Sequence, residues 1–333
     1  MNGVRNILST DELHPKLVTD TIARAEELRS TEGQALRESQ QLLAIRKVGG
    51  LSVYVAMLEP SLRTADSHTQ AAHWLGMHVR NRDTAQSSSL AKGESKRDMV
   101  MNIVAQDYDC LVIRDRGTDT PKIAASVSAA PIINAGNGYD DHPTQAMADI
   151  YTVSREVGAI EGLKVVIAGD NYYGRVNRAD ATMFSKFGNE LIFASLPGLE
   201  IQDDIRRKLE EQGTQYHEVP SLVAAVEFEP DVVVLSRLQR ERYIGENLRA
   251  GEPWDTDKIE RLYNENCALT PEVLRAVPQH TKILHPLPRG PELPDDSDPR
   301  IVIWPQVKNA VWTRVAGYEY VFRIGPFENE PSA

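Results

Sequence analysis

The sequence predicts an α/β protein with two doubly wound parallel-sheet domains joined by interdomain helices. Short apolar runs alternate along the chain with segments of helical spacing, which is the pattern of parallel βαβ units. The alternation restarts after a long helical segment near residues 143–158. The chain has 333 residues, more than one hydrophobic core usually supports. Together these observations predict two α/β domains joined near residue 150.

The first half is predicted to begin with a helix and to continue with four strands. Ser9 and Glu12 have the spacing of a capping box, which predicts the helix start. The apolar face that follows comprises Leu13, Val18, Ile22, Ala25 and Leu28. The strands are predicted at 51–58, 77–81, 109–114 and 131–135, with helical stretches between them. This set makes up the first predicted domain, residues 1–150.

The second half repeats the pattern. Its strands are predicted at 164–169, 190–195, 231–236 and 282–285, again with helical stretches between them. They make up the second predicted domain, residues 151–300. In such sheets ligands bind beyond the carboxyl ends of the strands, so the residues that follow each strand are the candidates for a site.

Composition and charge exclude several classes of protein. The net charge is −11, with no basic stripe, so we expect no nucleic-acid partner. No apolar run reaches ~18 residues and no signal-peptide pattern is present, so we expect no membrane segment and a cytoplasmic protein. Cys110 lies in an apolar run and is predicted to be a packed thiol. Neither it nor Cys267 has the spacing of a metal site.

The segment from Leu58 to Thr64 is the first candidate site. The strand at 51–58 stops at Pro60, and Ser61, Arg63 and Thr64 then precede a segment of helical spacing. Backbone N–H groups at a helix start, the helix dipole, two hydroxyls and a guanidinium form a site suited to a phosphate-like dianion. The alternative interpretation is a capped helix with a surface arginine.

Arginine residues lie at or after five of the six strand ends compared, those of 51–58, 109–114, 131–135, 164–169, 231–236 and 282–285, which favours the anion site. They are Arg63, Arg114, Arg175, Arg237 and Arg289. One such arginine is usually a solvated surface residue, but five at the same kind of position in a net-acidic chain are hard to explain by solvation. The pattern predicts a pocket that binds several anionic groups.

Other residues after the strands suit a carbonyl group and an amide-like NH₂ group. His142 could donate to a carbonyl oxygen, or it could be a structural histidine. Gln145 could recognise an amide through its paired donor and acceptor. Pro286 and Pro288 favour an extended loop whose carbonyl groups accept hydrogen bonds from an NH₂ group. The loop at 87–94 is either a surface loop or a lid that brings Lys92 and a serine to the anion.

These motifs together resemble the aspartate/ornithine carbamoyltransferase family, from about residue 5 to residue 323. Ser-Leu-Arg-Thr at 61–64 is similar to the family's Ser-Thr-Arg-Thr motif, and His-Pro-Thr-Gln at 142–145 is its second signature. Ser88 and Lys92 have the spacing of the loop that neighbouring subunits exchange. The segments at 169–175, 236–242 and 285–289 resemble the aspartate branch.

The resemblance implies the residues that bind carbamoyl phosphate. The phosphate would be held by Ser61, the Leu62 backbone, Arg63, Thr64 and Arg114. The carbonyl oxygen would be stabilised by Thr64, Arg114 and His142. The NH₂ group would be bound by Gln145 and the carbonyl of Leu287. Ser88 and Lys92 would arrive from the adjacent subunit, and Lys92 would also act in catalysis and on the acceptor.

The resemblance also implies an acceptor site. Arg175 would bind the α-carboxylate of aspartate, and Arg237 and Gln239 would bind its side-chain carboxylate, with Pro288 nearby. By resemblance the first domain binds carbamoyl phosphate and the second binds the amino acid. Residues 301–333 would form a segment that returns to the first domain.

The function implied is transfer of the carbamoyl group to L-aspartate in pyrimidine biosynthesis, with no metal and no cofactor. A homotrimer with shared active sites is implied, and the presence of a regulatory chain is left open. The chain departs from the aspartate branch at Leu62, at Ala65 and in the C-terminal stretch 311–327. Two alternatives are therefore kept: a paralogue that uses another acidic amine, and a silent homologue that binds anions or assembles with a true enzyme.

Overall fold

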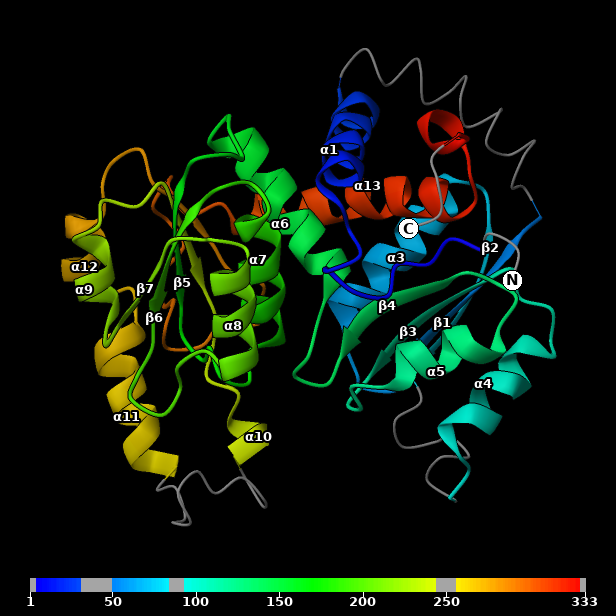
Figure 1. Ribbon diagram of the computed structural model, residues 1–333, viewed down its shortest axis with the longest axis horizontal. Coiled ribbons are helices and arrows are strands. Elements are labelled where there is room, and N and C mark those ends of the chain that lie inside the picture. The colour runs from blue at the N-terminus through cyan, green and yellow to red at the C-terminus, as the bar shows by residue number, and fades with distance from the viewer. Residues whose placement is uncertain (1–3, 31–49, 84–92, 244–255, 330–333) are drawn as a thin grey trace. The chain divides into compact units, whose positions relative to one another are not determined.

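The computed structural model describes residues 4–30, 50–83, 93–243 and 256–329. The chain divides into two compact units. Unit 1 contains residues 1–148 and 307–333, and unit 2 contains residues 149–306. Each unit is built on one parallel sheet flanked by helices, as predicted (Figure 1).

The sheet of unit 1 has four strands in the order β2-β1-β3-β4, and every neighbouring pair is parallel. Its strands are β1 (Ser52–Met57), β2 (His78–Asp83), β3 (Cys110–Asp115) and β4 (Ile132–Asn137). The helices of this part of the chain are α1 (Pro15–Arg29), α3 (Leu62–Trp74), α4 (Lys96–Val104), α5 (Thr120–Val127), α6 (Pro143–Glu156) and α13 (Ile303–Val321), of which α6 and α13 cross the boundary between the units. The four strands lie within two residues of the predicted runs.

Helices cover both faces of this sheet because the strands β1, β3 and β4 are largely buried on both sides. Met99, Val100 and Ile103 of α4 and Ala124 of α5 pack against one face. On the other face lie α3 and the C-terminal part of α13 (Figure 1). Cys110 is fully buried in β3, as predicted for a packed thiol, and burial raises its pKa.

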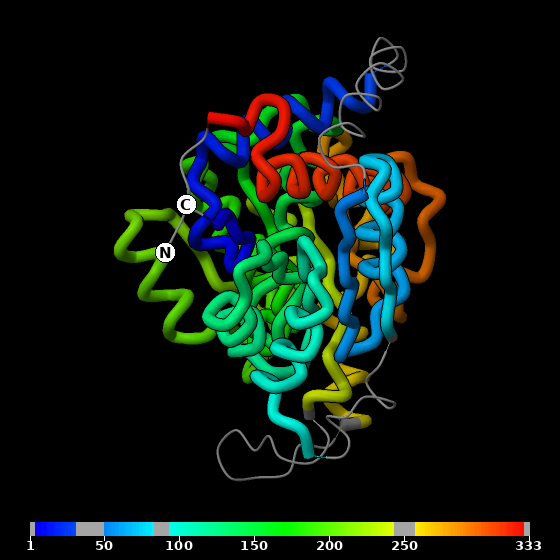
Figure 2. The backbone as a smooth tube through the Cα atoms, turned by 90° about the vertical axis from the view of Figure 1, so that its right-hand side faces the viewer, coloured from blue at the N-terminus to red at the C-terminus, as the bar shows by residue number. Residues whose placement is uncertain are grey.

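The first and last described segments of the chain lie together in unit 1 (Figure 2). The guanidinium of Arg5 is buried and donates to the carbonyl oxygen of Phe327 at 2.5 Å. Arg24 of α1 forms a buried ion pair with Glu319 of α13 at 2.7 Å. Both contacts join residues about 300 positions apart, so unit 1 is completed only by the end of the chain.

The predicted start of the first helix is wrong. Helix α1 begins at Pro15, and the imidazole of His14 accepts a hydrogen bond from the N–H of Leu17 at 3.1 Å. The segment expected to start the helix is held elsewhere, since Thr10, which lies between the expected capping residues Ser9 and Glu12, donates from its N–H and its hydroxyl to Asp141, both at 2.6 Å. This long-range contact outweighs the local capping signal.

The sheet of unit 2 has five parallel strands in the order β7-β6-β5-β8-β9. Its strands are β5 (Lys164–Ala168), β6 (Glu190–Ala194), β7 (Tyr216–Val219), β8 (Val232–Leu235) and β9 (Lys282–Leu284). The helices are α7 (Arg175–Ser185), α8 (Asp203–Glu211), α9 (Leu222–Val226), α10 (Arg240–Tyr243), α11 (Thr256–Cys267) and α12 (Pro271–Ala276). Strand β7 was not predicted, because this edge strand lacks an apolar run.

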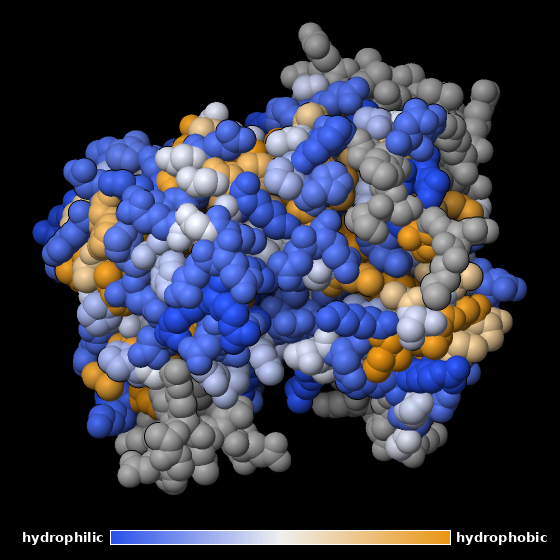
Figure 3. All heavy atoms as spheres, in the orientation of Figure 1, coloured by the Kyte–Doolittle hydropathy of each residue, from blue (hydrophilic) through white to orange (hydrophobic). Residues whose placement is uncertain are grey.

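The helices of unit 2 also cover both faces of their sheet, with α7 and α8 on one side and α9 and α12 on the other (Figure 1). Val273 of α12 and Leu222 of α9 join the strands in one buried cluster. Helix α8 buries only Ile205 and Leu209, and its outer face is hydrophilic (Figure 3).

In each sheet the direction of strand succession reverses between two central strands. The reversal lies between β1 and β3 in unit 1 and between β5 and β8 in unit 2. In doubly wound sheets the crevice at such a reversal, beyond the carboxyl ends of the strands, is the usual ligand site. Among the helices described, none has the length and apolar character needed to cross a membrane.

Candidate active site

Helix α3 begins directly beyond β1, at the reversal point of unit 1. Ser61 is its N-cap residue, but its hydroxyl does not cap the helix and instead contacts Thr64 Oγ1 at 2.9 Å. Thr64 is buried, whereas Arg63 and Leu62 are exposed, Leu62 by 76%. The first N–H groups of a helix have no partner within it, so this end suits an anion.

Arg114 and His142 lie close together in the same unit. Arg114 is the fifth residue of β3 and pairs in register with Met57 of β1. Its Nη1 lies 3.5 Å from Nε2 of His142, and its Nε lies 3.6 Å from the carboxylate of Glu59. The side chain of Arg114 is only 13% exposed. A guanidinium and an imidazole therefore occupy the carboxyl end of the central strands.

His142 is held by the residues on either side of it. Asp141 accepts from the N–H of His142 at 2.7 Å, and the hydroxyl of Thr144 lies 3.4 Å from Nδ1. Burial raises the pKa of Asp141 to about 6, against the opposing effect of hydrogen bonds from Thr10 and His142. When Thr144 donates to Nδ1, the proton of a neutral imidazole is on Nε2, where it can be donated to a ligand. Gln145 is half-buried and follows in the first turn of α6.

Unit 2 carries the arginines predicted for an acceptor. Arg237 follows β8 and forms an ion pair with Glu241, with one contact at 2.9 Å. The hydrogen bond that Arg237 donates to the carboxylate of Glu241 raises the pKa of Arg237, and the charges of Glu292 and Asp170 act in the same direction. The side-chain amide of Gln239 donates to the Arg237 carbonyl oxygen at 3.3 Å.

Asp170 joins the segment that carries Arg175 to the segment that carries Gln239. Its carboxylate is buried and accepts from the N–H of Tyr173 at 2.9 Å and from the N–H of Gln239 at 3.1 Å. Arg175 is the first residue of α7 and is itself buried. One carboxylate thus fixes both loops at the reversal point of unit 2.

Leu287 and Pro288 lie in the loop that follows β9. The peptide between them is cis, and Leu287 has a φ of 60°. The N–H of Leu287 donates to Nδ1 of His285 at 2.9 Å. Arg289 forms an ion pair with Asp296 at 2.9 Å.

Two of the predicted site residues, Ser88 and Lys92, lie outside the described residues. The described residues hold no group of three or more His, Cys, Asp or Glu side chains that could bind a metal ion.

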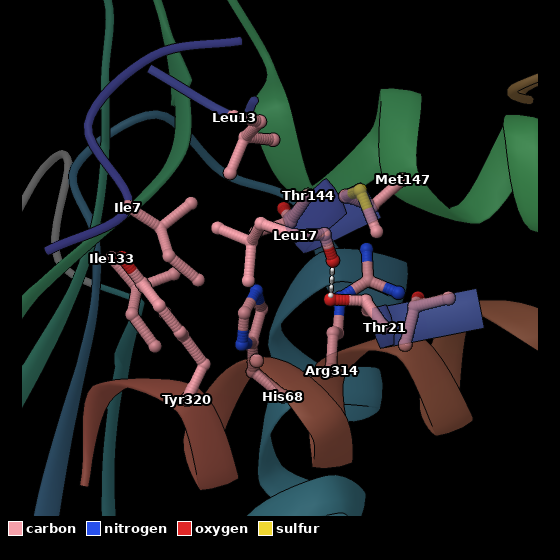
Figure 4. A pocket seen from close by; sticks show the side chains of 12 residues that line it. Ile7, Leu13, Leu17, Thr21, His68, Ile133, Thr144, Met147, Arg314 and Tyr320 are labelled. Atoms are coloured by element: carbon pink, nitrogen blue, oxygen red, sulfur yellow. Dashed lines mark hydrogen bonds between the residues drawn. The ribbon is translucent and has the colours of Figure 1, made fainter. Parts of the chain in front are cut away.

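Unit 1 also contains a separate apolar cavity, lined by Leu17, Thr144, Arg314 and Tyr320 among others (Figure 4). The imidazole of His68, from α3, points into it. His68 is 1% exposed, and its Nε2 has no hydrogen-bond partner among the described residues. Burial lowers the pKa of His68 well below its usual value, and the charge of Arg314 adds to the shift.

Sequence reasoning missed the residues that support the site. Four acidic residues contact predicted site residues or raise the pKa of one, and none of them had a predicted role in the site. They are Glu59, Asp170, Glu241 and Glu292. Glu241 carries a usable signal, because an acidic residue four positions after Arg237 has the spacing of an ion pair on a helix. Glu292 carries no such signal in the sequence, since its contacts with His285 and Gly290 depend on the path of the loop after β9.

Comparison with known proteins places the chain in context. Residues 5–155 match the model of the aspartate/ornithine carbamoyltransferase carbamoyl-P binding domain, and residues 161–319 match the Asp/Orn binding domain. The aspartate carbamoyltransferase catalytic subunit of Thermococcus onnurineus is 36% identical over 78% of this chain and 80% of its own length. That of Chromobacterium violaceum is 33% identical over 92% of this chain and 93% of its own.

Solved structures give the same result. The catalytic subunit of M. Jannaschii aspartate transcarbamoylase has a TM-score of 0.79 and 28% identity, over 98% of this chain and 99% of that one. The Trypanosoma cruzi enzyme in complex with carbamoyl phosphate and aspartate also has a TM-score of 0.79, with 25% identity over 94% and 95% of the two chains.

Proposed function

The chain belongs to the aspartate/ornithine carbamoyltransferase family, and from this premise we propose that it transfers the carbamoyl group of carbamoyl phosphate to the amine of L-aspartate. The observation that carries the proposal is the position of the motifs. The phosphate-type residues follow β1 and β3, and the carboxylate-type residues follow β5 and β8, so each set lies at the reversal point of its own sheet. The products would be N-carbamoyl-L-aspartate and phosphate.

In this proposal unit 1 binds the phosphate and activates the carbonyl group. Ser61, Arg63, Thr64 and the N-terminus of α3 receive the phosphate, and Arg114 bridges to the carbonyl oxygen. His142 donates from Nε2 to that oxygen. Nη1 of Arg114 and Nε2 of His142 lie 3.5 Å apart, and this proximity supports the assignment, because one oxyanion bound beside them can accept from both nitrogens when the imidazole proton is on Nε2.

Unit 2 would bind the acceptor and the NH₂ group. Arg175 receives the α-carboxylate, and Arg237 with Gln239 receives the side-chain carboxylate. The carbonyl of Leu287 accepts from the NH₂ group together with Gln145. The amine nitrogen attacks the carbamoyl carbon, a C–N bond forms, and the bond from carbon to the phosphate oxygen breaks. The amine proton leaves with the phosphate.

Three further expectations from the family belong to the proposal. The chain acts as a homotrimer, Ser88 and Lys92 reach the site of the neighbouring subunit, and the enzyme works in pyrimidine biosynthesis in the cytoplasm. The proposal assigns residues 1–150 to carbamoyl phosphate, residues 151–300 to aspartate, and residues 301–333 to a segment that returns to the first domain.

The direct test is an assay with carbamoyl phosphate and a panel of amines, read by detection of the ureido product. We expect turnover with L-aspartate. Turnover only with another acidic amine would instead favour a paralogue, for which the exposed Leu62 at the anion site is the motivating difference. Phosphate binding without turnover of any amine would identify a silent homologue.

A variant makes the assay specific for the acceptor site. Arg237→Ala should raise the KM for aspartate by about 10- to 100-fold, because it removes a charge-assisted pair, and should change the KM for carbamoyl phosphate far less. Arg240→Ala is the matched control, since Arg240 of α10 forms an ion pair with Glu260 of α11 and has no role in the proposed acceptor site. Equal effects of Arg237→Ala on both substrates would contradict the assignment of Arg237.

A further inference from the structure

The loop after β9 is closed around a single buried imidazole. Nδ1 of His285 accepts from the N–H of Leu287 at 2.9 Å, and Nε2 contacts the carboxylate of Glu292 at 2.9 Å. The same oxygen of Glu292 accepts from the N–H of Gly290 at 2.7 Å. His285 is 1% exposed and Glu292 is 2% exposed. These bonds tie both ends of the loop to one side-chain pair.

The partners of His285 determine its tautomer. A backbone N–H can only donate, so Nδ1 must be the acceptor toward Leu287. The carboxylate of Glu292 can only accept, so Nε2 must carry a proton. The backbone N–H of His285 is itself anchored to Gln306 at 3.0 Å. The ring is therefore fixed in orientation as well as in tautomer.

Glu292 is held as an anion. Burial alone would raise the pKa of Glu292. The hydrogen bonds that Glu292 accepts from His285 and from the backbone N–H of Gly290 lower this pKa by more than burial raises it, so the net shift is downward. Its charge also contributes to the raised pKa of Arg237. The pair of His285 and Glu292 thus holds the loop of Leu287 and also contributes negative charge that raises the pKa of Arg237.

We propose that His285 and Glu292 are positioning residues that aim the carbonyl of Leu287 at the NH₂ group of carbamoyl phosphate. The inference rests on the proposed function, because it takes from it the role of the Leu287 carbonyl. Leu287 has a positive φ, which a leucine rarely adopts without support from its surroundings. The hydrogen bond from its own N–H to His285 supplies that support.

The experiment compares two acyl phosphates that differ at one group. Carbamoyl phosphate has an NH₂ group where acetyl phosphate has a methyl group, so only the first can donate to the Leu287 carbonyl. We expect the wild-type chain to bind carbamoyl phosphate more tightly. In His285→Ala and in Glu292→Ala this preference should fall by about tenfold, the value of one hydrogen bond, while the affinity for acetyl phosphate stays unchanged.

Two further variants keep the proposal testable if the alanine variants fail to fold. Glu292→Gln retains an oxygen that can accept from Gly290 and His285, so it should keep most of the preference. Gly290→Ala would place a Cβ 2.7 Å from Oε2 of Glu292, which should displace that side chain and lower the preference.

The outcomes separate this inference from the function on which it rests. An unchanged preference in the alanine variants, or in Gly290→Ala, would overturn it. An equal loss of affinity for both acyl phosphates would also overturn it, because that result indicates general disruption. If the wild-type chain itself shows no preference for carbamoyl phosphate over acetyl phosphate, the result contradicts the proposed role of the Leu287 carbonyl, and with it the inference that rests on that role.

Discussion

Single residues show how burial controls charge in this protein. His68 has its imidazole in an apolar cavity, with no hydrogen-bond partner for Nε2 among the described residues. Its Nδ1 lies 3.4 Å from the hydroxyl of Tyr318, at the outer limit of a hydrogen bond. An unsatisfied buried polar atom costs about 1–3 kcal/mol. Burial separately disfavours the charged imidazolium, and this lowers the pKa of His68.

His68→Phe should therefore stabilise the protein, and increasingly so at acidic pH. The unfolded chain protonates this histidine below about pH 6.5, whereas the folded protein does not until a much lower pH. Stability that is present above pH 6.5 is thus lost as the pH falls, by up to about 1.4 kcal/mol per pH unit. The difference in unfolding free energy between variant and wild type should grow from pH 7 to pH 5.

Denaturant unfolding at several pH values measures this difference. When the unfolding free energy of the wild type is subtracted from that of the variant, the contributions of the other titrating groups cancel. These groups include Asp141 with its raised pKa. The same substitution at His73, which is exposed on the same helix, is the control and should change stability little. A difference for His68→Phe that stays constant with pH would contradict the buried neutral imidazole.

At the scale of an element, the start of α7 depends on a close backbone approach. A Cβ at Gly174 would meet the carbonyl oxygen of Asp170 well inside van der Waals contact. Gly174→Ala should shift the N-terminus of α7 and with it Arg175, raising the KM for the acceptor about tenfold or more. Gly317→Ala in α13 is the control, because a Cβ at Gly317 would lie 3.4 Å from Cδ1 of Ile7, which is ordinary van der Waals contact. Kinetics with unaltered acceptor KM would refute this role for Gly174.

The same scale shows what could be predicted from the sequence. Eight strands were predictable, most of them because they are short apolar runs, and the arginines were predictable because they lie at or shortly after the ends of predicted strands. Strand β7 was missed because an edge strand needs no apolar run. The capping box at Ser9 and Glu12 misled because Thr10 contacts Asp141, 131 residues away. Long-range partners such as Glu292 leave no local signal.

For the whole molecule, the proposed sharing of sites between subunits makes a distinct prediction. Lys92→Ala and Arg63→Ala should each be inactive alone, because each lacks a group that the site needs. Mixed trimers should regain some activity, since one type of site then contains neither substitution. Activity after mixing, with mixed trimers confirmed by a tag on one chain, measures the effect. Confirmed mixed trimers without recovery would count against shared sites.

The contacts of Arg5 with Phe327 and of Arg24 with Glu319 also bear on how the chain is synthesised. Unit 2 is one continuous stretch inserted into unit 1, whose sequence is interrupted. During translation every residue of unit 2 has been made before unit 1 receives residues 307–321 of α13 and the segment around Phe327. The inserted unit can therefore fold while the chain is still growing. Unit 1 must wait for the segment that follows unit 2, and its buried Arg5 stays without Phe327 until then.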